Sequence, residues 1–353
     1  MTTDDDRVLL EIKGLKTHFP TSEGVVEAVN GVDMFIRRGE TLCVLGESGC
    51  GKSITARSVL QIVDRPGRIV AGQILYHDDE LGTVDLAAMK PTGKEIRRVR
   101  GRKIAMIFQE PMTSLSPVHS IGNQISEAIL LHENVSKTEA MEKTVAVLKR
   151  VGIPNAAERL GNYPFQLSGG MRQRAMIALA LSCNPDLLIA DEPTTALDVT
   201  TQAQILDLMR DLQQEKGMAM MFITHDLGVV AEIADRVAVM YLGQVVETAA
   251  VDDVFHNPKH PYTQALLDSI PKMGAHVSRA RTPAGERSRL MSIRGMVPHP
   301  FAKPDGCPFN TRCDRVMPIC RKAGPRMADF GGGHSACCHL YEPELAATGE
   351  YHG

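Results

Sequence analysis

A run of glycine and polar residues between positions 46 and 53 has the composition of a phosphate-binding loop. It follows the pattern Gly-x-x-x-x-Gly-Lys-Ser and lies between an expected buried strand, 41–45, and an expected helix that begins at Lys52. Glycines let backbone N–H groups converge on phosphate oxygens, and a helix start adds a favourable dipole. Lys52 can neutralise the β- and γ-phosphates, and Ser53 can ligate Mg²⁺. The expected nucleotide-binding residues are Gly46, Glu47, Ser48, Gly49, Cys50, Gly51, Lys52 and Ser53. Alone, this loop indicates only ATP or GTP binding.

A pair of carboxylates forms a second candidate site. Asp191 and Glu192 follow the apolar run 187–190, which reads as a buried strand. In a parallel sheet, a carboxylate at the C-terminal end of a strand emerges beside the phosphate loop. Asp191 would then hold Mg²⁺, and Glu192 could polarise an attacking water as a general base. The alternative is a strand end that carries two solvated acids.

The segment Leu167-Ser168-Gly169-Gly170-Met171 lies between these two candidate sites in the sequence. It resembles the LSGGQ signature of ABC ATPases, with Met171 where the family usually has Gln. The resemblance implies that Ser168, Gly169 and Gly170 bind the γ-phosphate of an ATP held by a second subunit. Each active site would therefore be shared between two subunits.

Further segments match the same family in the expected order. Gln109 matches the Q-loop, for which the resemblance implies sensing of the γ-phosphate and Mg²⁺. Residues 196–198, Ala-Leu-Asp, match the D-loop that crosses the dimer interface. His225 matches the switch histidine, which implies contacts to the γ-phosphate and to Glu192. Phe19 matches the aromatic residue that stacks on adenine, although it could instead belong to the core.

The elements that must position these residues are strands alternating with helices, which predicts a parallel α/β sheet. The resemblance implies a P-loop NTPase (RecA-like) core with an antiparallel β subdomain and a helical signature subdomain. We expect an ATPase domain over residues 1–258 and a small Cys-rich C-terminal extension over 259–353. Within the extension we expect a linker at about 271–295 and a metal-binding tail at 296–341. The arginine-rich linker reads as solvated, with contact to anionic lipid as the alternative.

Composition limits the function classes. The chain has 353 residues and a formal net charge of −3, and it contains no Trp. A near-neutral chain poor in aromatic residues does not favour nucleic-acid binding. No apolar run is long enough to span a bilayer, and the acidic N-terminal segment does not have the pattern of a secretory signal. We therefore expect a peripheral protein on the cytoplasmic face of the inner or plasma membrane.

Three stretches narrow the resemblance to one branch of importers. Residues 108–117, 190–199 and 257–263 are similar to the Q-loop region, the strand end and the HPY element of dipeptide and oligopeptide importer ATPases. That resemblance implies a second ATPase subunit, two transmembrane permease subunits and an extracytoplasmic solute-binding protein. Peptide is the expected solute, while nickel, opines, glutathione and oligosaccharides are alternatives within the same family.

Two other classes of function remain as alternatives. One is a soluble ABC ATPase that acts on nucleic acid or ribosomes, but such proteins usually carry two ATPase cores or a coiled-coil insertion. The other is a metal-sensing module for which ATP is only a switch.

Five of the eight cysteines lie between positions 307 and 338. Clustered cysteines in a reducing compartment indicate metal binding more than disulfides, although the spacing is not that of most zinc modules. Four thiolates would suit a [4Fe–4S] cluster, which the peptide-importer resemblance also implies; zinc and metal-free thiols are the alternatives. The same resemblance implies that Cys337 is the extra thiol and that the ligands are Cys307, Cys313, Cys320 and Cys338.

Overall fold

The structure is a computed structural model, and it describes residues 8–109, 114–195, 197–270 and 293–342. Glu110 to Thr113 of the predicted Q-loop region, Ala196 of the predicted D-loop and most of the predicted linker lie outside the described residues. Within the described part of the chain, no helix combines the length and apolar character needed to cross a bilayer.

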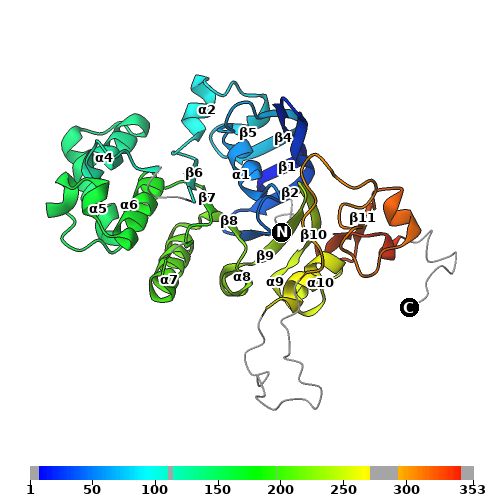
Figure 1. Ribbon diagram of the computed structural model, residues 1–353. Coiled ribbons are helices and arrows are strands. Elements are labelled where there is room, and N and C mark those ends of the chain that lie inside the picture. Colours follow the sequence, from blue (N-terminus) through cyan, green and yellow to red (C-terminus); the bar gives the residue numbers. More distant parts are fainter. Residues whose placement is uncertain (1–7, 110–113, 196, 271–292, 343–353) are drawn as a thin grey trace, which may run out of the picture.

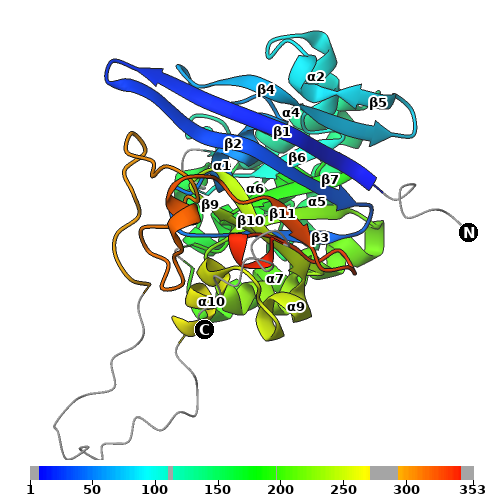
Figure 2. The same cartoon turned by 90° about the vertical axis from the view of Figure 1, so that its right-hand side faces the viewer.

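Two sheets form the framework (Figures 1 and 2). The smaller sheet is antiparallel with the order β2-β1-β4-β5, and the larger sheet has the order β11-β12-β10-β9-β3-β8-β7-β6. The strands of the smaller sheet are β1 (Val8–Thr21), β2 (Gly24–Arg37), β4 (Arg68–Asp78) and β5 (Gly82–Asp85). Those of the larger sheet are β3 (Thr41–Leu45), β6 (Ile104–Ile107), β7 (Leu187–Asp191), β8 (Ala219–Thr224), β9 (Arg236–Tyr241), β10 (Gln244–Ala250), β11 (Met327–Asp329) and β12 (Ser335–Cys337).

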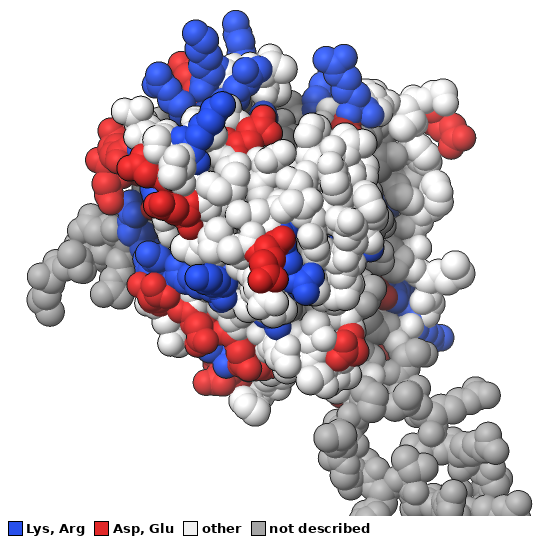
Figure 3. Space-filling model, turned by 90° about the vertical axis from the view of Figure 1, so that its left-hand side faces the viewer, with Lys and Arg blue, Asp and Glu red and all other residues white. Residues whose placement is uncertain are grey.

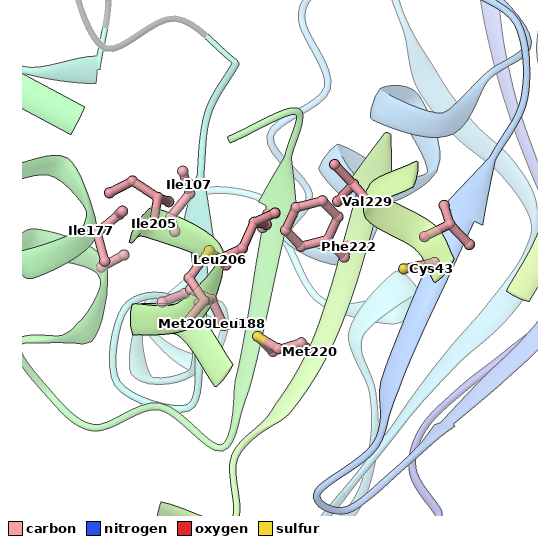
Figure 4. Packing of buried hydrophobic residues seen from close by; sticks show 14 of the residues in the cluster. Cys43, Ile107, Ile177, Leu188, Ile205, Leu206, Met209, Met220, Phe222 and Val229 are labelled. Carbon is pink, nitrogen blue, oxygen red and sulfur yellow. The ribbon is translucent and has the colours of Figure 1, made fainter. Parts of the chain in front are cut away.

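The strands from β9 to β6 are parallel to one another, and they are buried on both faces. Because side chains alternate along a strand, each strand contributes residues to two hydrophobic cores, one on each face of the sheet. Leu188 and Phe222 pack with the helices on one face, whereas Leu187 and Ile223 pack with the antiparallel sheet on the other. Figure 4 shows part of the first core, in which strand residues meet side chains of α6, α7 and α8.

The helices follow the order expected for such a sheet. They are α1 (Lys52–Val59), α2 (Lys94–Val99), α4 (Ile121–His132), α5 (Lys137–Arg150), α6 (Gly169–Leu181), α7 (Val199–Lys216), α8 (Leu227–Ile233), α9 (Val251–His256) and α10 (Pro261–Asp268). Short 3-10 turns lie at 86–88, 158–161, 164–166, 318–321 and 339–341. Helices α4, α5 and α6 form a lobe at one end of the molecule (Figure 1).

Local sequence explains several helix starts. Ser136 and Glu139 form a capping box at the start of α5. Ser168 caps α6, and Asp198 caps α7 by accepting hydrogen bonds from the backbone N–H and the hydroxyl of Thr201. The predicted signature serine and D-loop aspartate are therefore both N-cap residues.

The C-terminal tail continues the core sheet. Strand β12 pairs antiparallel with β10 and also with β11, which lies at the edge. The tail lies beside β9 and β10, at the opposite end of the molecule from the helical lobe (Figures 1 and 2). Its buried residues Cys307, Phe309 and Cys320 belong to the same hydrophobic core as the parallel strands. The predicted extension therefore shares its packing with the ATPase core.

Candidate functional site

Four of the predicted site segments meet at the carboxyl edge of the parallel strands. The phosphate loop follows β3, Gln109 follows β6, Glu192 follows β7 and His225 follows β8. Because these strands are neighbours in the order β3-β8-β7-β6, their ends converge on one cleft. The cleft has a volume of about 510 Å³. Its lining residues are Leu45, Gly46, Glu47, Ser48, Gln109, Glu192, His225, Leu266 and Val297.

The glycines of the phosphate loop permit close backbone contacts. Gly46 and Gly51 have φ angles of 155° and 103°, conformations that L side chains rarely adopt. A Cβ atom at Gly46 would lie 2.3 Å from the carbonyl oxygen of Met240, and one at Gly51 would lie 2.4 Å from that of Ala28. The loop can take this path only with glycine at these two positions.

The lysine of the loop is buried and held by the loop itself. Lys52 donates from Nζ to the carbonyl oxygens of Gly46, at 2.6 Å, and Glu47, at 3.1 Å. Cys50 is also buried, and its pKa is raised by burial. Ser48 and Gly49 are exposed at the tip of the loop.

Two of the predicted magnesium ligands, Ser53 and Asp191, lie next to each other. The hydroxyl of Ser53 donates to Oδ1 of Asp191 at 2.8 Å, although the two residues are distant in sequence. Asp191 is almost fully buried, and burial raises the pKa of its carboxyl while the hydrogen bond from Ser53 lowers it. A hydroxyl and a carboxylate are oxygen donors of the kind that Mg²⁺ prefers.

Glu192 is the centre of a small network. Its carboxylate accepts hydrogen bonds from the amide of Gln109 at 3.1 Å and from the hydroxyl of Thr195 at 3.1 Å. Nδ1 of His225 lies 3.1 Å from its other oxygen. The backbone at Glu192 has a φ of 47°, an uncommon conformation for a non-glycine residue. Three side chains from three segments thus orient one carboxylate, and Thr195 is the member that sequence reasoning missed.

The signature residues lie elsewhere. Ser168 and Gly169 are exposed, and Gly170 is half-buried at the start of α6. A Cβ atom at Gly169 would contact nothing within 4 Å. The amide of Gln173, one turn into the same helix, donates to the carbonyl of Pro193, which connects α6 to the segment after Glu192.

Phe19 lies on β1 and outside the residues that line the cleft. It pairs with Val26 of β2 and is half-buried. A Cβ atom on Gly67 would lie only 2.4 Å from the nearest carbon of the Phe19 ring, so the ring packs directly against this glycine. The prediction that it stacks on adenine stays a prediction.

Four cysteines of the tail line one small cavity of about 10 Å³: Cys307, Cys313, Cys320 and Cys338. Cys337 is not among its lining residues, and its Sγ donates to the carbonyl oxygen of Pro325 at 3.1 Å. Burial raises the pKa of Cys307 and of Cys338 to about 12. In the described ranges, no three His, Cys, Asp or Glu side chains are arranged to hold one metal ion. The four thiols therefore line one cavity without forming a ready-made site for a single metal ion among the described residues.

The comparisons with known proteins agree with this architecture. Residues 29–195 match the family described as ABC transporter, and residues 246–320 match that described as oligopeptide/dipeptide transporter, C-terminal region. The chain belongs to the ATP-binding subunits of this ABC transporter family.

Relatives match over nearly the whole chain. A putative peptide import ATP-binding protein of Brucella ovis is 52% identical over 340 residues, which cover 96% of this chain and 98% of the relative. The oligopeptide transport ATP-binding protein AppD of Bacillus subtilis is 49% identical over 339 residues, again 96% and 98%. Among solved structures, a dimeric post-hydrolysis ATP-binding cassette bound to ADP and Pi has a TM-score of 0.61 and 25% identity, and it covers 69% of this chain and 99% of that chain.

Proposed function

We propose that this chain hydrolyses ATP to power peptide import, with Glu192 as the general base. The observation that carries the proposal is the network on Glu192, because Gln109, Thr195 and His225 fix the direction of a carboxylate in the cleft. A base oriented in this way can polarise a water aimed at the γ-phosphate. When nucleotide enters, His225 and Gln109 would each either keep or break the hydrogen bond to the Glu192 carboxylate.

The phosphate loop supplies the binding half of this reaction. Lys52 exchanges its two carbonyl partners for the β- and γ-phosphates, and the loop amides and the N-terminus of α1 receive the β-phosphate. Ser53 and Asp191 would hold Mg²⁺, which neutralises phosphate charge when bound. Asp191 remains buried beside Ser53, and Glu192 faces the cleft.

The signature half supports a shared active site. Ser168 caps α6 and is exposed together with Gly169, so this helix start is open to a second molecule. In the dimer we propose, these residues bind the γ-phosphate of the ATP held by the opposing phosphate loop. The opposing subunit is a second, related ATPase or a second copy of this chain.

The permease subunits require a surface near the cleft. An apolar groove of about 260 Å³ lies between β6 and the helical lobe, and Phe108 and Ser114 line it on either side of the predicted Q-loop residues. We place permease contact there, because a change at Gln109 would reach the groove through its neighbour Phe108. The helical lobe carries mixed charges around a broad uncharged area on the face seen in Figure 3, which does not favour a nucleic-acid partner.

Peptide is the solute we propose, because relatives along the whole chain are described as peptide import ATP-binding proteins. Nickel, opines, glutathione or oligosaccharides are the other solutes to be tested. An extracytoplasmic solute-binding protein completes the assembly, and the chain is a peripheral subunit on the cytoplasmic face.

Reconstitution tests this function. The chain is purified with its permease subunits and any second ATPase, placed in proteoliposomes and given the solute-binding protein. Peptide-loaded binding protein should stimulate ATP hydrolysis several-fold, and peptide should accumulate only with ATP. Stimulation by another solute but not by peptide would replace the solute assignment. Recovery of DNA or ribosomes in place of permease would refute the transporter function.

The tail supports a separate proposal, a [4Fe–4S] cluster held by Cys307, Cys313, Cys320 and Cys338, with zinc as the alternative metal. The supporting observation is that these four thiols line one cavity and Cys337 does not. Anaerobic purification should give a brown protein with iron and acid-labile sulfide. Cys338→Ser should lose the colour and Cys337→Ser should keep it. Colourless protein that contains zinc would assign zinc, and colourless protein without metal would refute both.

A further inference from the structure

Glu47, the second residue of the phosphate loop, is tied down through all of its polar groups. Its backbone N–H donates to the hydroxyl of Tyr262 at 2.9 Å. Its carbonyl oxygen accepts from Lys52 at 3.1 Å. Its two carboxylate oxygens accept hydrogen bonds from the two terminal nitrogens of Arg312, at 2.6 and 3.0 Å. Two of these three partners come from the region after residue 258, far from the loop in sequence.

Arg312 is held rigidly in the tail. Its side chain is only 3% exposed, and its Nε donates to the carbonyl oxygen of Arg294 at 3.0 Å. Its guanidinium lies 5.8 Å from the ring of Tyr241 and 6.0 Å from that of Phe309. A buried, bidentate guanidinium sets both the distance and the direction of its partner, which a single ammonium cannot do.

Tyr262 is also fixed. It is fully buried near the start of α10, and its ring lies 4.7 Å from that of Tyr241 and 5.3 Å from that of Phe309. Phe309 stands between Cys307 and Arg312 in the tail. The aromatic cluster therefore connects α10, β9 and the cysteine-lined segment to the base of the phosphate loop.

We propose that Arg312 and Tyr262 are positioning residues for the phosphate loop, through which the C-terminal extension sets the affinity of the chain for ATP. Both residues hydrogen-bond to Glu47, and the carbonyl oxygen of Glu47 accepts a hydrogen bond from Lys52. The extension therefore determines the positions of the loop and of its lysine before nucleotide binds. The inference rests on the proposed ATP-binding function. It adds a role for the extension that needs neither a metal nor the transported solute.

The physical reason is preorganisation. A loop that already has its bound path does not have to be ordered when the phosphates enter, and this saving appears as tighter binding. Releasing the Glu47 carboxylate or its N–H lets the loop sample other paths. The rate of hydrolysis after binding is expected to change little. Glu192, His225 and Gln109 line the cleft, whereas Arg312 and Tyr262 do not.

The test measures binding of a fluorescent ATP analogue with Mg²⁺ to the full-length chain, and KM and kcat of the assembled transporter. Arg312→Gln should raise Kd and KM about tenfold, with kcat nearly unchanged, which is the signature of lost uniform binding. Tyr262→Phe, which removes one oxygen, should raise both about threefold. Arg312→Lys should lie between wild type and Arg312→Gln.

A double-mutant cycle identifies the contact. Glu47→Gln/Arg312→Gln should bind no more weakly than the weaker single variant, because both changes remove the same interaction. Arg294→Gln is the matched control: its side chain is 83% exposed and pairs with exposed Asp314. It should bind ATP like wild type.

Each outcome is decisive. Wild-type Kd in both Arg312→Gln and Tyr262→Phe, or additive effects in the double variant, would overturn the inference. If Arg312→Gln lowers the melting temperature of the chain enough to disturb the tail, Tyr262→Phe and Arg312→Lys carry the test. Failure of the wild-type chain to bind ATP would overturn the proposed function instead.

Discussion

The phosphate loop and the signature segment are both glycine-containing helix starts, yet the space around their glycines differs. Around Gly46 and Gly51 the backbone of β9 and β2 leaves no space for a Cβ atom. Around Gly169 there is open space, and Ser168 is exposed. The first pair of glycines is required by contacts inside the chain, whereas none of the residues that the structure describes requires glycine at position 169.

The difference teaches where the active site is completed. One half is built from side chains that already contact one another, including Ser53 with Asp191 and Glu192 with Gln109. The other half is an exposed helix N-terminus, which is suited to an anion but lies outside the residues that line the cleft. A shared site in a dimer gives both halves a function.

The largest expected effect is at Glu192. Glu192→Gln should lower kcat of the assembled transporter by at least ~10²-fold, because an amide cannot take the proton of the attacking water. ATP binding should remain, and an ATP-dependent dimer should accumulate because both binding halves are intact. Size-exclusion chromatography with and without ATP measures the dimer. Glu142→Gln, an exposed change on α5, is the control, and an unchanged rate in Glu192→Gln would remove the general-base assignment.

A change in the signature half should separate binding from turnover in another way. Gly169→Asp places a carboxylate where we expect a γ-phosphate, and the open space means that the fold tolerates it. ATPase activity should fall about 100-fold, while the isolated chain keeps its affinity for ATP. Gly161→Asp, also at an open position, should leave both unchanged. Normal hydrolysis by Gly169→Asp would show that this helix start does not meet nucleotide.

The smallest expected effect is on stability, and it compares the two halves directly. Gly51→Ala should lower the free energy of unfolding by ~1–3 kcal/mol, because its φ of 103° and the carbonyl of Ala28 both oppose a Cβ atom. Gly169→Ala should change it by less than ~1 kcal/mol. Chemical denaturation of the nucleotide-free chain measures both. Equal losses in the two variants would contradict the contrast between the two segments.

Much of the site could be predicted because it depends on local rules. Buried runs such as 41–45 and 187–190 are readable as parallel strands, and polar residues directly after them must gather at one edge. The order of the segments then identified the family, which the comparisons confirm. The antiparallel pairing of β12 with β10 was not predicted, because a three-residue strand in a cysteine-rich tail has no periodic signal.

Two facts needed the tertiary structure. Thr195 joined the site because the turn after β7 brings its hydroxyl back to Glu192. Arg312 reached Glu47 across a sequence separation of 265 residues.

The sequence by itself determined which chemical groups follow which buried strands, and therefore the nucleotide chemistry and the family. Those properties depend on hydrogen bonding and side-chain alternation over a few residues, so they are visible in spacing. Only the tertiary structure decided that Thr195 contacts Glu192 and that Tyr262 and Arg312 of the extension contact Glu47 in the phosphate loop. Such contacts arise from the packing of distant segments, and no local pattern of residues encodes the partner that packing provides.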